Sequence, residues 1–178
     1  MTLHDRDLHG ATVTIEEIPP VARFSLRVRD KDRAAAGAAL GVDLPDRVGD
    51  RAASGDRTLV CLGPDEWLVT APEQARDGIV RDMAAIRDGA PHSLTDISDR
   101  EITFRVAGPA ALTLMTIGCP RDLRRLEPGR AVRTVFDTAQ IVLWRDGPDS
   151  FRLDVWRSFA PHVRSLLEIG RKEIAAGF

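Results

Sequence analysis

Residues 57–71 read RTLVCLGPDEWLVTA, and this stretch decides the fold class. Two runs rich in β-branched and apolar residues, 57–62 and 66–71, flank a Gly-Pro-Asp tripeptide at residues 63–65. Glycine and proline between two such runs favour a tight turn, so the stretch predicts a β-hairpin. The fold must therefore contain an antiparallel sheet.

The segments on either side of the hairpin alternate between strand and helix. Before it, residues 22–28 alternate apolar and polar side chains, which predicts a half-buried strand, and residues 34–40 predict a small-residue helix that ends at Gly41. After it, apolar side chains recur every three or four positions over residues 75–86, which predicts an amphipathic helix, and a strand follows at residues 92–97. The first half therefore reads as β-α-β-β-α-β.

The second half of the chain repeats nearly the same order of elements. Its predicted elements are a strand at 101–106, a short helix that ends at Gly118, strands at 131–136 and 139–144, a second Gly-Pro-Asp turn at 147–149, a strand at 151–156 and a helix that begins near Pro161. We therefore predict an α+β fold of two tandem ferredoxin-like (split βαβ) halves, produced by a diverged duplication. The alternative is that two ordinary α+β units share turn residues by chance.

These patterns also predict how the chain is organised. Residues 1–11 mix histidine, aspartate and arginine, and we expect them to form a flexible tail. Residues 12–178 are expected to form a single compact domain, with pseudo-repeats at about 12–98 and 99–178.

Composition argues against several functions. The chain has 178 residues with 25 basic and 27 acidic side chains, and its arginines are scattered among aspartates, so we expect no nucleic-acid partner. It has no signal-peptide pattern and no apolar run near the roughly 18 residues of a membrane span, so we expect a cytoplasmic protein without membrane contact. It also lacks both G-x-G-x-x-G and G-x-x-x-x-G-K-[ST], so we expect no nucleotide or flavin cofactor in this chain.

No pattern of catalytic or metal-binding residues stands out. The four histidines lie far apart without a companion nucleophile, and Cys61 and Cys119 have no histidine at ligand spacing, so we predict no catalytic residue and no metal site. His4 and His9 fall in the expected tail. Asp96 and Asp99 lie between two predicted strands, where their side chains can form a turn or, alternatively, an acid/base pair.

The three tryptophans, Trp67, Trp144 and Trp156, all lie in predicted hairpin strands. Core packing accounts for such residues in general. However, Trp156 alternates with the apolar residues of its strand and is followed by Arg157, and an outward Trp-Arg pair is typical of a protein interface. We name Trp156, Arg157 and Trp67 as candidate partner contacts.

Several stretches of this chain resemble the gamma-subunit family of heterotetrameric sarcosine oxidases, which is related to the folate-binding aminomethyltransferases of the glycine cleavage system. The stretches that carry the resemblance are Leu62–Leu68, Thr95–Arg100, Phe104–Ala110, Gly118–Pro120 with Asp122–Leu123, and Phe151–Pro161. Their order and spacing make the match more specific than any one of them.

The resemblance implies a non-catalytic assembly subunit of a complex that oxidatively demethylates sarcosine to glycine. Hydrogen peroxide and, with tetrahydrofolate present, methylenetetrahydrofolate are the other products that it implies. It also implies that FAD, FMN, NAD and tetrahydrofolate bind to the complex outside this chain, whose partners would be the alpha, beta and delta subunits, chiefly alpha. A further hypothesis for this chain, independent of the resemblance, is a generic interaction domain in an unrelated complex.

The chain departs from the aminomethyltransferases at two motifs. Those enzymes have D-[VI]-S-H-M at the turn where this chain has Asp96-Ile97-Ser98-Asp99-Arg100, and their Gly-Gly-x-x-Asp-Asp segment is missing after Phe136. Asp122 stands where their folate-contacting aspartate would fall, so the resemblance makes it the one candidate folate contact. Loop packing or a salt bridge with Arg124 is the alternative role for Asp122, and a stand-alone folate-binding one-carbon-transfer protein is the alternative function.

Overall fold

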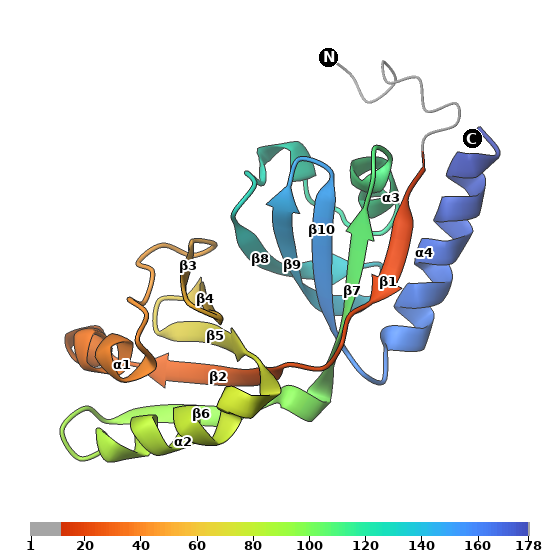
Figure 1. Cartoon of the computed structure of the whole chain (residues 1–178). Helices are drawn as coiled ribbons and strands as arrows, with labels where there is room; N and C mark the ends of the chain where they lie inside the picture. The colour runs from red at the N-terminus through yellow and green to blue at the C-terminus, as the bar shows by residue number, and fades with distance from the viewer. Residues whose placement is uncertain (1–11, 178) are drawn as a thin grey trace. The chain divides into compact units, whose positions relative to one another are not determined.

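A five-stranded antiparallel sheet in the order β3-β4-β5-β2-β6 forms around the predicted hairpin (Figure 1). In the computed structural model, which describes residues 12–177, its strands are β2 (Ala22–Val28), β3 (Arg51–Ser54), β4 (Arg57–Gly63), β5 (Glu66–Ala71) and β6 (His92–Asp96). The hairpin pairs Cys61 with Trp67 and, after a bulge, Gly63 with Glu66. The hairpin prediction is confirmed.

Two helices pack on one face of this sheet, namely α1 (Arg33–Leu40) and α2 (Arg76–Ala85). Leu40 of α1 and Met83 of α2 lie in the same apolar cluster as Phe24, Leu26 and Trp67 of the strands. Gly41 ends α1 in the left-handed conformation, with φ of 67°, which glycine adopts without steric cost. The alternating and helical patterns of the sequence therefore describe this part of the chain correctly.

A second five-stranded sheet has the order β1-β7-β10-β9-β8. Its strands are β1 (Thr14–Glu17), β7 (Glu101–Ala107), β8 (Ala131–Phe136), β9 (Ala139–Gly147) and β10 (Ser150–Trp156), and the helices of this half are α3 (Ala111–Thr116) and α4 (Ala160–Ala175). A Cβ atom on Gly170 of α4 would lie 2.4 Å from the Ile117 side chain and 2.8 Å from that of Leu114. Gly170 therefore allows α4 to approach α3 closely.

Short 3-10 turns complete the list of elements, at Asp30–Asp32, Glu73–Ala75, Ser98–Arg100 and Leu123–Arg125. No helix within residues 12–177 is long and apolar enough to cross a membrane. The chain divides into two compact units. The N-terminal unit comprises residues 20–99 and 130–132, and the C-terminal unit comprises residues 12–19, 100–129 and 133–177.

The first strand differs from expectation. We expected residues 12–19 to belong to the first pseudo-repeat, but β1 pairs with β7, from Thr14 opposite Ala107 to Glu17 opposite Phe104. Its sequence, TIEE, has one apolar residue and no alternating pattern, so periodicity could not predict it. Pairing with β7 places residues 12–19 in the C-terminal unit.

Candidate partner-binding surface

Trp156 is the last residue of β10 and is 44% exposed. In the register of the sheet it lies opposite Glu101, and the guanidinium of Arg100 stacks 5.3 Å from the centroid of its ring. A cation on one face of an indole ring stabilises its position while the rest of the ring stays in contact with water. The structure therefore places Trp156 on the surface, where alternation along β10 predicts it.

Phe159, which precedes α4, is also exposed, at 41%. Its backbone N–H donates to the Trp156 carbonyl over 2.8 Å, and the Arg157 N–H donates to the Arg100 carbonyl, also over 2.8 Å. These bonds hold two aromatic side chains on one turn, with Arg157 exposed between them. We name Arg100, Trp156, Arg157 and Phe159 together the Trp156 patch.

Sequence reasoning identified Trp156 and Arg157 but missed Phe159. The spacing of α4 gives no signal for it. The buried side of the helix follows Ala160, Val163 and Leu167, and Phe159 lies four residues before Val163, which is the spacing of that same stripe. Helical periodicity therefore predicts a buried side chain at Phe159, whereas the structure exposes it at the N-cap position of α4.

Trp67 is placed differently from its prediction as a partner contact. It is 1% exposed, its indole N–H donates to the Pro45 carbonyl over 2.9 Å, and the Arg33 guanidinium lies 5.6 Å from its ring centroid. Trp67 is a core residue of the N-terminal unit and has no surface to offer a partner. This corrects the expectation for Trp67, and Trp156 is the tryptophan that remains exposed.

Trp144, the third tryptophan, is fully buried within a polar cluster of the C-terminal unit. Its indole N–H donates to Asp154 Oδ2 over 2.6 Å, and the Thr103 hydroxyl donates to Asp154 Oδ1 over 2.5 Å. Asp154 is itself only 3% exposed. The carboxyl group therefore satisfies two buried donors from neighbouring strands.

Asp122, the candidate folate contact, is held by the arginines that follow it. Its Oδ1 accepts hydrogen bonds from Arg124 Nε at 2.9 Å and from the Arg124 backbone N–H at 3.2 Å, and Arg125 lies 3.6 Å from its Oδ2. The side-chain bond from Arg124 is the main reason that the pKa of Asp122 is lowered. The salt bridge expected as the alternative is thus present.

A cavity lies beside Asp122, with a volume of about 210 Å³. Its walls are Leu112, Thr116, Cys119, Pro120, Arg121, Asp122, Leu123 and Arg124. Small-molecule sites commonly have volumes of about 300–1,000 Å³, so this cavity is smaller than a site for a dinucleotide or flavin.

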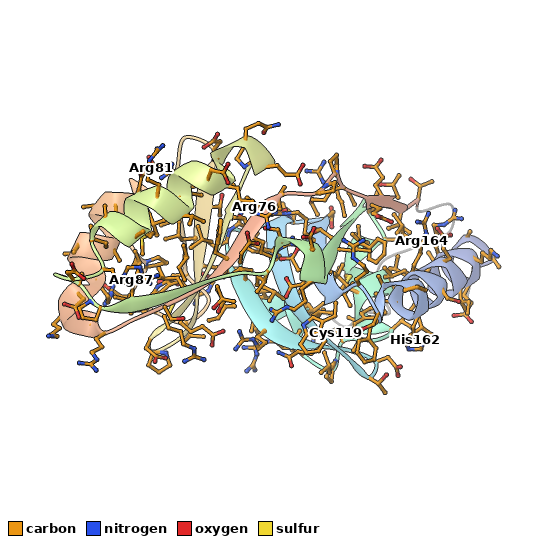
Figure 2. The ribbon with its side chains drawn as sticks, turned by 90° about the horizontal axis from the view of Figure 1, so that it is seen from below. Arg76, Arg81, Arg87, Cys119, His162 and Arg164 are labelled. Atoms are coloured by element: carbon orange, nitrogen blue, oxygen red, sulfur yellow. The ribbon has the colours of Figure 1, made fainter. Side chains whose placement is uncertain are left out.

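Asp96 and Ser98 form the turn that ends the N-terminal unit. Asp96 Oδ1 accepts from the Ser98 backbone N–H at 2.9 Å and from its hydroxyl at 2.7 Å, while Oδ2 accepts from Arg76 Nε at 2.5 Å. Arg76 projects from the start of α2 (Figure 2). Burial alone would raise the pKa of Asp96, but the bonds from Ser98 and Arg76 together lower it. The sequence left two roles open for Asp96, in a turn or in an acid/base pair. Its contacts are those of a turn residue.

The lowered pKa of Asp96 predicts sensitivity to acid. Because the folded-state pKa lies below the ordinary value, the carboxylate stabilises the fold above about pH 4, and this contribution is lost as the pH falls through the folded-state pKa. Asp96→Ala should lower the free energy of unfolding by about 1 kcal/mol at pH 7 and by less at pH 3. Urea unfolding at the two pH values measures this, with Asp88→Ala, an exposed position, as the control. An equal loss at both pH values would contradict it.

The remaining polar candidates have structural contacts. Cys61 and Cys119 are free and buried, and burial raises the pKa of the Cys61 thiol, which disfavours a reactive thiolate. His162 lies 2.9 Å from Asp137, and His4 and His9 lie outside the described residues. Among residues 12–177, no three His, Cys, Asp or Glu side chains are grouped so that they could hold a metal ion.

Comparison with known protein families finds one that spans most of this chain. The family model described as "Sarcosine oxidase, gamma subunit family" matches residues 29–170. A sarcosine oxidase subunit gamma from Arthrobacter sp. is 37% identical over 147 residues, which are 80% of this chain and 71% of that protein. One from Corynebacterium sp. (strain U-96) is 32% identical over 169 residues, covering 92% of this chain and 82% of that protein.

Solved structures of other proteins also match most of this chain. A chain of the heterotetrameric sarcosine oxidase from Corynebacterium sp. U-96, in complex with pyrrole 2-carboxylate, matches with a TM-score of 0.82 and 30% identity, covering 92% of this chain and 85% of that one. The glycine cleavage system aminomethyltransferase T from Bartonella henselae matches with a TM-score of 0.66 at 12% identity, covering 88% of this chain and 45% of that one. At that identity the second match shows a shared α+β fold.

Proposed function

The chain belongs to the sarcosine oxidase gamma subunit family, and from that membership we propose that it is the non-catalytic assembly subunit of a heterotetrameric sarcosine oxidase. Such a complex oxidatively demethylates sarcosine to glycine and produces hydrogen peroxide and, with tetrahydrofolate, methylenetetrahydrofolate. The observation that carries the proposal is the match over 92% of the chain to a subunit of a heterotetrameric enzyme. The exposed Trp156 supports it, because tryptophan is among the residue types enriched at protein interfaces.

We propose that the cofactors FAD, FMN, NAD and tetrahydrofolate are held by the other subunits. A volume of about 210 Å³ beside Asp122 suits none of the dinucleotides or flavins, and Asp122 is already bonded to Arg124. The partners of this chain are then the alpha, beta and delta subunits, with alpha as the main contact, and the complex works in the cytoplasm.

We further propose that both units are ferredoxin-like and descend from one duplicated ancestor. In the N-terminal unit, β2 lies between β6 and β5, with β4 beyond β5. In the C-terminal unit, β7 lies between β1 and β10, with β9 beyond β10, so β1 takes the position that β6 has in the other sheet. The same strand order in both sheets supports a duplication in which one edge strand is supplied from the N-terminus.

Co-purification from the source cells tests the assembly role. We expect native mass spectrometry to find the chain together with three other subunits, and the purified complex to have the visible absorption spectrum of a flavoprotein. A flavin-free monomer in those cells would overturn the proposal.

A separate preparation, of the isolated chain, decides the alternative function. We expect calorimetric titration of the isolated chain with tetrahydrofolate to give no binding heat at high micromolar ligand. Saturable binding that Asp122→Asn abolishes and the nearby Glu127→Gln leaves intact would instead favour a folate-binding one-carbon-transfer protein.

A further inference from the structure

The cavity beside Asp122 has two kinds of wall. Leu112 of α3 and Leu123 of the following 3-10 turn contribute apolar surface, whereas Arg121, Asp122 and Arg124 contribute charge. Small-molecule sites commonly combine a mostly apolar lining with a few polar or charged groups that fix the orientation of the ligand. This cavity has that combination within a volume of about 210 Å³.

The charges of the wall do not balance. Arg124 bonds to both carboxyl oxygens of Asp122, at 2.9 and 3.3 Å, and Arg125 lies 3.6 Å from its Oδ2. Among residues 12–177, Arg121 forms no hydrogen bond or ion pair. Glu127, the next carboxylate along the chain, is exposed and is not part of the wall. The wall therefore contains a guanidinium that no carboxylate of the described chain pairs.

Arg145 of β9 holds this loop in place and adds positive charge beneath it. Its Nη1 donates to the carbonyls of Leu123 and Leu126 at 2.9 and 2.7 Å, and its Nε and Nη2 donate to the carbonyls of Gly147 and Pro148. Carbonyl oxygens satisfy the N–H groups of a guanidinium but do not neutralise its charge. The loop is thus positioned before a ligand binds, which lowers the entropic cost of binding.

We infer that this cavity binds a small aliphatic monocarboxylate, whose carboxylate pairs with Arg121 and whose apolar part contacts Leu112 and Leu123. The planar guanidinium of arginine can pair with a carboxylate through two parallel N–H···O bonds, so it suits this class of ligand. Asp122 is neutralised by its own arginines and does not oppose the bound anion. The inference is independent of the assembly role, because all residues of the wall belong to the C-terminal unit of this chain.

Titration of the full chain with butyrate, followed by amide chemical shifts in NMR at constant ionic strength, tests the site. We expect saturable shifts in residues 112–124, with a Kd of about 1 mM, which a ligand of this size can reach. Butyramide has nearly the same shape without the charge and should bind about 10-fold more weakly or less. Formate has the charge without the apolar part and should bind about 5-fold more weakly or less.

Arg121→Gln is the decisive variant. Because Arg121 forms no hydrogen bond or ion pair within the described chain, its replacement should leave the fold unchanged. We expect Arg121→Gln to weaken butyrate binding by about 10-fold or more. Arg125→Gln is the matched control, since Arg125 lies on the same loop with its side chain 89% exposed but is not part of the wall. It should change the Kd by less than about 3-fold, and thermal unfolding of both variants checks the fold.

Several results would overturn the inference. One is the absence of saturable shifts up to about 50 mM butyrate, and another is equal binding of butyrate and butyramide. Equal losses from Arg121→Gln and Arg125→Gln would show a diffuse effect of positive charge instead of a site. If butyrate does not bind and Arg121→Gln weakens assembly with the other subunits, the cavity is a subunit contact and holds no small-molecule ligand.

Discussion

Asp154→Ala is expected to lower the free energy of unfolding by about 3 kcal/mol, because it removes the acceptor of two buried hydrogen bonds. The indole N–H of Trp144 and the hydroxyl of Thr103 donate to its two carboxyl oxygens at 2.6 and 2.5 Å. Trp144 is fully buried and Thr103 is 5% exposed, so water does not replace the lost acceptor without rearrangement. Each unsatisfied buried donor costs roughly 1–3 kcal/mol.

Urea unfolding followed by near-UV circular dichroism measures this effect, and two variants separate its parts. Asp154→Asn keeps one carbonyl oxygen, so it should cost about half as much as Asp154→Ala. Thr103→Val removes one donor together with its bond and should cost about 1 kcal/mol. Asp154→Ala with a loss below about 1 kcal/mol would show that the cluster tolerates the missing acceptor, contrary to this expectation.

Trp67→Ala is expected to cost about 4 kcal/mol, through a large cavity in the core of the N-terminal unit. Its side chain is 1% exposed and lies in the same apolar cluster as Phe24 and Leu26. The substitution also leaves the Pro45 carbonyl without its indole donor and Arg33 without the ring beneath it. Truncation of a buried tryptophan is among the most destabilising single changes in a protein.

Differential scanning calorimetry of three variants tests the placement of this side chain. Trp67→Phe keeps most of the volume and should cost less than half as much as Trp67→Ala. Trp156→Ala, at the exposed tryptophan, should change the unfolding temperature of the isolated chain little. Equal destabilisation by Trp67→Ala and Trp156→Ala would contradict the contrast between a core and a surface tryptophan.

The longer elements of this fold could be predicted from the sequence, because apolar side chains recur in them at the spacing of a strand or a helix. The alternation from Ala22 to Val28 and the helical spacing from Ile79 to Met83 have counterparts in β2 and α2. The short strands β1 and β3 could not be predicted. Each has only four residues and neither buries a residue fully, so backbone pairing rather than a buried side chain defines them.

The candidate surface could be predicted only where alternation separates the two faces of a strand. On β10, Phe151, Leu153 and Val155 are buried and Trp156 is exposed, so the pattern identified the exposed tryptophan. On β5, Trp67, Leu68 and Val69 are all buried, and a strand buried on both faces gives no alternating signal. Asp154 shows the other limit, since its two buried donors come from the neighbouring strands β7 and β9, and Thr103 of β7 lies 51 residues away in sequence.

The position of β1 in the sheet has a consequence for how the chain is synthesised. The Thr14 hydroxyl bonds to the Ala107 carbonyl across 93 residues of sequence, so β1 leaves the ribosome well before its partner strand exists. At about 5–20 residues per second, the nascent chain carries this strand unpaired for roughly 5–20 seconds. The sheet of the N-terminal unit, from β2 to β6, can form in that interval, whereas the other sheet gains its edge strand only after β7 emerges. A fragment that begins at residue 20 would leave one edge of β7 open, and an open edge is a site for aggregation.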